Sequence, residues 1–185
     1  MVLLDFVAAG LLVGLALGGS PRRLANLRVR FLWLAYVGIA LQVAAFPSGV
    51  LPWSMPEAAA KGLWLGSFAA LGALIVANIR IQGLALIGIG QACNLIAILA
   101  NHGLMPVTRG ALDAAGISYH LHNNSIQVVQ PHVAWLVDRW AVPSWLPMGN
   151  VYSVGDVAIG IGVLVTIVIA MRPRLALRAL GHASS

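Results

Sequence analysis

Five long apolar stretches constrain the fold of this chain more than any other feature. They cover residues 2–19, 31–46, 58–78, 83–100 and 151–171. About 20 helical residues span the hydrocarbon core of a bilayer, and somewhat fewer suffice where the bilayer is thin. Backbone groups without hydrogen-bond partners are costly in lipid, and the stretches lack the alternation of barrel strands, so each is predicted to be a helix. The sequence therefore predicts an all-α fold, a polytopic bundle of five transmembrane helices.

The composition agrees with a protein whose main solvent is lipid. Hydrophobic residues make up 60% of the 185 residues and charged residues only 9%, and the mean hydropathy is +0.90. Such a composition cannot cover the surface of a water-soluble domain. The length allows one compact unit, so residues 1–185 are predicted to form a single transmembrane domain. The first stretch carries Asp5 and lacks a basic leader, so we expect a helix there rather than a cleaved signal peptide.

The charged residues predict how the bundle is oriented. Eight of the 11 Lys and Arg residues lie beside one set of helix ends: Arg22, Arg23, Arg28, Arg30, Arg80, Arg172, Arg174 and Arg178. Short loops rich in Lys and Arg stay in the cytoplasm, so the N-terminus is predicted outside and the C-terminus inside. All five carboxylates lie at or near the opposite ends: Asp5, Glu57, Asp113, Asp138 and Asp156. We therefore expect a multi-pass membrane protein with its scarce polar chemistry on the outer side.

The basic balance favours lipid over nucleic acid as a partner. The formal net charge is +6, but the arginines lie at helix ends rather than on a soluble face. Anionic lipid headgroups attract arginines in such positions. We expect membrane lipids as partners, with a larger membrane complex or a homo-oligomer as further candidates, and no nucleic acid. The single cysteine, Cys93, excludes an internal disulfide.

The extracytoplasmic segment 101–150 is too long to be a passive linker. Within it, the apolar residues from Val129 to Trp140 recur at helical spacing, and Pro131 suits a first helical turn. The sequence therefore predicts a short helix over 130–140, lying in the outer interface and covering the bundle.

The polar residues near the outer ends are the candidates for function. An ionisable residue inside a membrane span is a functional candidate by default, and Asp156 is one, with Ser153 on the same face. Gln91, Asn94 and Asn101 lie near one face of the fourth stretch. We predict an outward-facing ligand-binding pocket formed by six residues: Asn94, Asn101, His102, Asn150, Ser153 and Asp156. The alternative is that these groups form hydrogen bonds between helices and bind nothing.

Two further patterns have a functional and a structural interpretation. His120 and His122 form an H-x-H pair that could bind zinc if the segment were a strand, or could simply be solvated. No cofactor is predicted, and a bound lipid is the candidate ligand. Gly10, Gly14 and Gly18 form two overlapping G-x-x-x-G motifs, which favour close helix contact inside the bundle or, alternatively, with another subunit.

One run resembles a known catalytic motif. Residues 152–162 read Tyr-Ser-Val-Gly-Asp-Val-Ala-Ile-Gly-Ile-Gly. They resemble the last-helix motif F-N-x-A-D-x-x-I-x-x-G of lipoprotein signal peptidases, whose aspartate matches Asp156. The stretch from Cys93 to Ala97, followed by His102 and a glycine, is similar to that family's G-N-L-I-D-R and later H-G. The resemblance implies an aspartyl hydrolase in which two aspartates activate a water.

The chain departs from that pattern at two positions. Ser153 replaces the motif's asparagine, and Ala97 stands where the second catalytic aspartate is expected. Asp138 is the candidate to replace that aspartate, as the partner of Asp156.

A broader resemblance covers most of the chain. The residues that carry it are Asn94 with Leu95, the run His-Gly-Leu-Met-Pro-Val over 102–107, and the run Asn-Val-Tyr-Ser-Val-Gly-Asp over 150–156. They are similar to an uncharacterised family of small bacterial five-helix membrane proteins. This resemblance implies a fold and a location but no activity.

Three functional hypotheses follow in order of preference. The first is a small non-catalytic inner-membrane protein, acting as an accessory subunit or as a lipid-binding or ligand-binding module. The second is the aspartyl-type membrane hydrolase, with Asp156 and Asp138 as acid and base. The third is a small transporter or channel, which ranks last because neither internal symmetry nor a broken-helix pair is visible.

Overall fold

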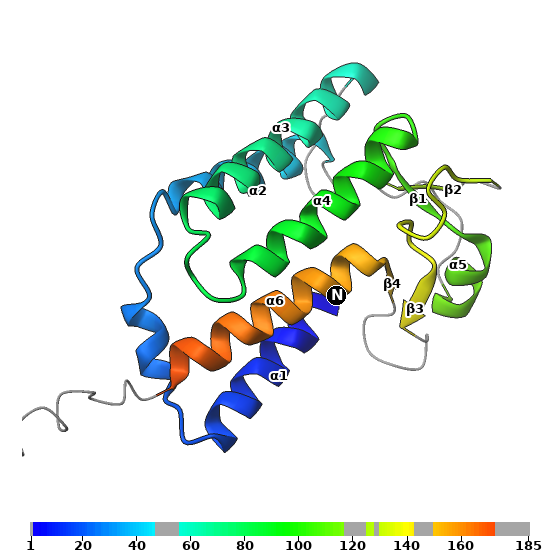
Figure 1. Ribbon diagram of the computed structural model, residues 1–185. Helices are drawn as coiled ribbons and strands as arrows, with labels where there is room; N and C mark the ends of the chain where they lie inside the picture. Colours follow the sequence, from blue (N-terminus) through cyan, green and yellow to red (C-terminus); the bar gives the residue numbers. More distant parts are fainter. Residues whose placement is uncertain (1, 47–55, 117–124, 128–129, 143–149, 173–185) are drawn as a thin grey trace, which may run out of the picture.

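Five long helices form the body of the protein in the computed structural model (Figure 1). The structure describes residues 2–46, 56–116, 125–127, 130–142 and 150–172. The helices are α1 (Val2–Ala16), α2 (Trp33–Ala45), α3 (Glu57–Ala77), α4 (Leu84–Ala100) and α6 (Val154–Met171). Each coincides with one of the five predicted apolar stretches, so the prediction of five helices is confirmed.

The long helices lie in a row in the order α2, α3, α4, α6 and α1. Helix α2 packs on α3, and α4 packs on α6, which also packs on α1; the contact between α3 and α4 is less extensive (Figure 1). Helices α1 and α6 run in the same direction, because Phe6 meets Gly160 near their starts and Gly14 meets Met171 near their ends. The other neighbours in the row are antiparallel.

Two hydrogen-bonded connections gather the basic residues at one end of the row. A 3-10 helix, η1 (Pro21–Asn26), follows α1 and lies against the end of α6, where the backbone N–H of Ser20 donates to the carbonyl of Met171 over 3.0 Å. The side chain of Asn78 accepts from the N–H of Arg30 over 2.7 Å and donates to its carbonyl over 2.8 Å. We call this the arginine end; its described arginines are Arg22, Arg23, Arg28, Arg30, Arg80 and Arg172.

Helices α3 and α6 are each long and apolar enough to cross a membrane, judged by length and composition alone. Their mean hydropathies are 1.6 and 2.4. Helices α1, α2 and α4 are shorter but also apolar. Large apolar side chains on several helices are exposed, among them Leu12 and Tyr36, each 68% exposed. Such surfaces suit contact with lipid.

The opposite end, which we call the carboxylate end, contains two pairs of β-strands, which an all-α fold does not predict. Strand β1 (Met105–Val107) pairs in parallel with β2 (Ser125–Gln127), and β3 (Trp140–Val142) pairs antiparallel with β4 (Asn150–Tyr152). Between β1 and β2 lies a short helix, α5 (Arg109–Ala115), whose N-terminus is capped by the hydroxyl of Thr108. The chain is mostly helical, as predicted, but its all-α assignment missed these two small sheets.

The predicted interfacial helix over 130–140 is wrong. Residues 132–135 form a turn in which Val133 has a φ of 49°, and Trp140 begins β3. The backbone N–H of Asp138 donates to the carbonyl of Pro106 over 3.0 Å, which an extended segment permits and a helix does not. Leu136 and Val137 are both buried, at 1% and 0% exposure, so their apolar character reflects burial of an extended segment rather than one helical face.

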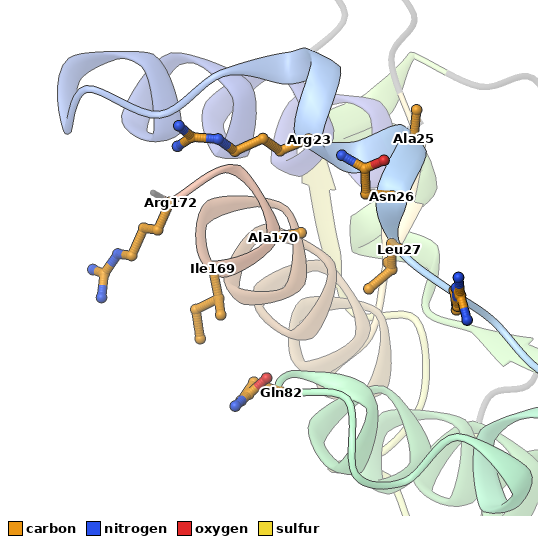
Figure 2. Close-up of a pocket in the computed structure, with 9 residues that line it drawn as sticks. Arg23, Ala25, Asn26, Leu27, Gln82, Ile169, Ala170 and Arg172 are labelled. Carbon is orange, nitrogen blue, oxygen red and sulfur yellow. The ribbon is translucent and has the colours of Figure 1, made fainter. Parts of the chain in front are cut away.

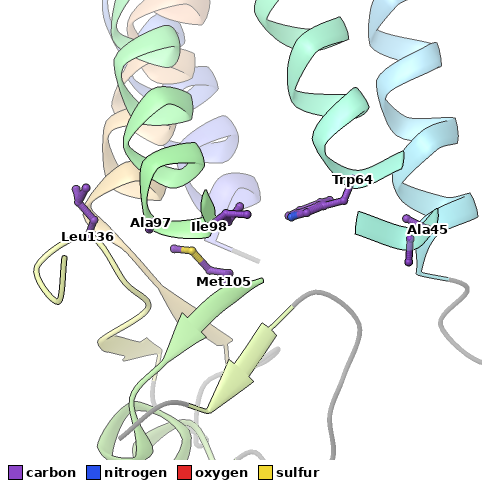
Figure 3. Packing of buried hydrophobic residues seen from close by; sticks show 7 residues of the cluster. Ala45, Trp64, Ala97, Ile98, Met105 and Leu136 are labelled. Carbon is purple, nitrogen blue, oxygen red and sulfur yellow. The ribbon is translucent and has the colours of Figure 1, made fainter. Parts of the chain in front are cut away.

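An apolar cluster fastens the segment after α4 to the ends of the helices (Figure 3). Trp64 of α3 is its largest member, with Phe46 and Phe68 packed edge-on at ring distances of 5.4 and 5.1 Å. Met105 of β1 and Leu136 belong to the same cluster. Burial of these side chains is the main force that holds the extended segments against the bundle.

Glycines set how closely α6 approaches its neighbours. A Cβ atom on Gly90 of α4 would meet the backbone of Gly155 and lie 2.8 Å from the backbone nitrogen of Ile159. Gly10 and Gly14 of α1 face α6, so the G-x-x-x-G face packs inside the bundle; a Cβ on Gly18 would meet nothing within 4 Å. Small residues let helix backbones pack tightly where lipid supplies no hydrophobic force between helices.

The Gly90 contact generates a stability prediction. The variant Gly90→Ala is expected to lose about 1 to 3 kcal/mol of unfolding free energy, because the new methyl group meets backbone that cannot move aside. Gly62→Ala in α3 is the matched control, since a Cβ there meets nothing within 4 Å; it should be neutral or slightly stabilising. Thermal unfolding in a mild detergent measures both, and equal midpoints for the two variants would contradict the close approach.

Candidate functional site

Three of the predicted site residues form one hydrogen-bond network where α4 meets the start of α6. Asn94 donates from Nδ2 to Oδ1 of Asp156 over 2.9 Å. Ser153 Oγ lies 2.8 Å from Oδ1 of Asn94 and 3.1 Å from Oδ2 of Asp156, and its single proton can serve one of these oxygens at a time. The network therefore links the two helices through side chains that the sequence singled out.

The same residues build the N-terminus of α6. Ser153 is the N-cap: its Oγ accepts from the backbone N–H of Asp156 over 3.1 Å, and Asp156 Oδ2 accepts from the backbone N–H of Ser153 over 2.9 Å. This is a capping box, in which two unpaired backbone donors of a helix start are satisfied reciprocally. Both carboxylate oxygens of Asp156 thus accept hydrogen bonds, and Ser153 is fully buried. The arrangement gives Asp156 a structural role.

The remaining polar residues of α4 and its end point to other partners. Gln91 donates from Nε2 to the carbonyl of Phe68 in α3 over 2.7 Å. Asn101, which is buried, accepts from the N–H of His132 over 2.9 Å and donates to its carbonyl over 3.0 Å. Asn101 therefore fastens the turn at residue 132 to the end of α4 and does not join the Asn94 network.

The other predicted ligands belong to different elements of the carboxylate end. His102 follows α4, is exposed and has a φ of 61°. Asn150 begins β4, opposite Val142 of β3. His120 and His122 lie outside the described residues. Among the described part of the chain, no group of three or more His, Cys, Asp or Glu side chains could hold a metal ion.

Asp138 is the most unusual ionisable residue of the carboxylate end. Its side chain is buried, with 8% exposure, and Oδ1 has no hydrogen-bond partner among the described residues. Arg139 donates its backbone N–H to the carbonyl of Tyr152, and Trp140 pairs with Tyr152, so Asp138 lies beside the start of α6. Burial, and next the negative charge of Asp156, raises the pKa of Asp138 to about 7.

The environment of Asp138 could not be predicted from its sequence neighbours. In the sequence, Asp138 follows the apolar run of Leu136 and Val137. That run indicates burial, but the contact with Asp156 depends on the pairing of β3 with β4. Two carboxyl groups in electrostatic contact, one of them with a raised pKa, are a feature of several acid and base catalysts.

The protein is a bundle of apolar helices in which polar side chains form hydrogen bonds between α4 and the start of α6. The comparisons with known proteins add a family to this description. A model described as "Family of unknown function (DUF5317)" matches residues 26–168, so the chain belongs to that family. The match runs from the last residue of η1 into α6, and it confirms the resemblance to an uncharacterised family. No curated protein and no solved structure matches the chain.

The raised pKa of Asp138 makes the stability of the protein depend on pH. The folded state holds a proton on Asp138 up to about pH 7, whereas the unfolded chain releases it near 3.8, the ordinary pKa of an aspartate. The contribution of Asp138 therefore falls as the pH rises between about 4 and 7, by on the order of a few kcal/mol in all.

Asp138→Asn removes the titrating carboxyl group and is expected to make the unfolding free energy less dependent on pH. The variant should unfold at a higher temperature than the wild type at pH 8, whereas near pH 4 the two should be alike. Asp113→Asn is the control, because Asp113 is exposed on α5. Thermal unfolding across this pH range measures the difference, and a wild-type advantage at pH 8 would contradict the burial of an unpaired carboxyl group.

Proposed function

We propose that this chain is a small non-catalytic protein of a bacterial inner membrane. It crosses the membrane with five helices, its N-terminus outside and its C-terminus inside, and acts as an accessory subunit or as a lipid-binding or ligand-binding module. Its arginine end faces the cytoplasm and its carboxylate end faces outward.

One observation carries the non-catalytic part of the proposal: Asp156 is engaged in a capping box and in a bond to Asn94. Both of its oxygens accept hydrogen bonds from neighbouring groups of the fold. These bonds occupy part of the capacity of the carboxylate to accept hydrogen bonds, and so leave less of it for a water or a substrate. Asp156 instead stabilises the helix start and the contact between α4 and α6.

The distribution of charge and of apolar surface supports the membrane part. The described arginines of the arginine end belong to η1, to the connections beside it, and to the end of α6. Lys and Arg at such positions are retained on the cytoplasmic side. Exposed apolar side chains such as Leu12 and Val76, 68% and 72% exposed, would need lipid or a partner helix to cover them.

Gentle extraction tests this proposal. Purified in a mild detergent and examined by native mass spectrometry, the full chain is expected to retain phospholipid, a second copy or a larger partner. A chain that is found in the soluble fraction, or a clean monomer that retains neither lipid nor partner, would sink the proposal.

A second candidate function, an aspartyl-type hydrolase, is favoured by one observation at the carboxylate end. Asp138 is buried, its Oδ1 has no partner among the described residues, and the charge of Asp156 contributes to its raised pKa. A protonated acid beside a second carboxylate is the arrangement with which a water can be activated. The last-helix resemblance to lipoprotein signal peptidases points to the same pair.

An activity measurement separates the two functions. Under the hydrolase hypothesis, the wild type in lipid cleaves a lipoprotein precursor peptide, and Asp138→Asn and Asp156→Asn each abolish cleavage. Asp113→Asn should leave it unchanged, because Asp113 is exposed and pairs only loosely with Arg109, at 4.0 Å. A folded wild type that does not cleave the peptide, or an active Asp138→Asn variant, excludes this pair as the catalytic centre.

A further inference from the structure

The arginine end carries a groove that none of the predicted site residues line. It has a volume of about 1080 Å³ and lies between η1, the end of α6 and the turn from α3 to α4 (Figure 2). Three arginines, Arg23, Arg28 and Arg172, line it together with the amide side chains of Asn26 and Gln82. The volume is that of a site for a ligand of ordinary size.

The three arginines of the groove have no carboxylate partner in the described part of the chain. The ion pairs recorded there are between Lys61 and Glu57 and between Arg109 and Asp113, at the other end. Arg28 and Arg172 are exposed, and Arg23 is half-buried. Guanidinium groups gathered without an acid repel one another, and an anion bound among them removes that repulsion.

Hydrogen bonds at the end of α6 offset part of the repulsion between the helix end and an anion. The end of a helix presents carbonyl oxygens that repel negative charge. At α6 the carbonyl of Met171 is already occupied, since it accepts from the N–H of Ser20 over 3.0 Å and from Nη1 of Arg23 over 3.3 Å. These bonds also fix the position of Arg23 at the edge of the groove.

The groove has an apolar side as well. Leu27, Ile169 and Ala170 line it next to the charged groups. Close to this end of the bundle, Phe31 and Trp33 are 50% and 58% exposed, as apolar and amphipathic side chains are at a lipid boundary. A ligand that fits such surroundings carries a phosphate on a body that continues into apolar surface.

We propose that this groove binds the phosphate group of an anionic phospholipid. The proposal rests on the membrane location and lipid-binding role proposed above. Guanidinium groups bind phosphate oxygens with paired hydrogen bonds, and Arg28 and Arg172, whose side chains have no hydrogen-bond partner among the described residues, can donate them. Asn26 and Gln82 supply amides for the hydroxyl groups of the headgroup. The shared chemistry is that of a phosphate ester, so a free phosphate is the competing source.

Two matched double variants test the site in the full-length protein. Arg28→Gln with Arg172→Gln removes two charges from the groove, whereas Arg22→Gln with Arg80→Gln removes two charges from the same end without touching the lining. Each protein is placed in nanodiscs of phosphatidylcholine with a minor fraction of phosphatidylglycerol, and its binding of phosphatidylglycerol is measured by native mass spectrometry. Inorganic phosphate is added in a separate arm as the competitor.

The expected result is that the groove variant binds phosphatidylglycerol at least about tenfold more weakly than the wild type, and that the control variant stays close to it. Equal weakening in both variants would show a diffuse effect of charge and overturn the groove. Full displacement by inorganic phosphate would overturn the lipid as the source of the anion. A wild type that retains other lipids or a partner but shows no preference for phosphatidylglycerol would overturn the groove and leave the proposed function standing.

Discussion

The close approach of α4 and α6 is the constraint on which the carboxylate end depends. With glycine at positions 90 and 155, the two backbones come near enough for Asn94 to reach the cap of α6. In lipid, association of helices depends on packing and on hydrogen bonds between them rather than on the hydrophobic effect. The glycine contact and the Asn94 network therefore reinforce each other, and the start of α6 is fixed by both.

The two ends of the bundle use their charged groups in different ways. At the carboxylate end, Asp156 accepts hydrogen bonds from its neighbours and Asp138 is enclosed by the extended segments. At the arginine end, most guanidinium groups face outward, and Arg23 alone of the groove's arginines donates a recorded bond to the fold. The carboxylate end is consequently suited to holding the structure together, and the arginine end is suited to contact with something outside the protein.

Hydropathy was sufficient to predict the five long helices, because length and apolar character are what a lipid-facing helix requires. The observed helices differ from the predicted stretches by about three residues or fewer at each end. The short strands could not be predicted, since three residues show no periodicity and their partners are distant in sequence. The helix predicted over 130–140 was wrong for a related reason. An apolar run such as Leu136 and Val137 occurs both on a helical face and in an extended segment buried on both sides.

Of the six residues predicted to form a pocket, three lie in one hydrogen-bond network and three do not. Asn94, Ser153 and Asp156 meet as their positions on the fourth and fifth stretches indicated. Asn101 shares a face with Asn94, yet it is the C-cap of α4, and its side chain bonds to the carbonyl of Ala97 and to the backbone of His132. The arginine groove could not be predicted, because arginines at helix ends are already accounted for by the orientation of the helices in a membrane. The shape of the groove depends on how η1 packs against α6.

The bond between Asn101 and His132 has a consequence for how the carboxylate end can vary. Asn101 pairs with the N–H and the carbonyl of one residue, as a neighbouring strand would, and touches no side-chain atom of it in these two bonds. The amide of Asn101 thus replaces the backbone of a neighbouring strand, and its bonds do not depend on the side chain at position 132. The point at which the chain returns to α4 therefore does not depend on which side chain stands at position 132.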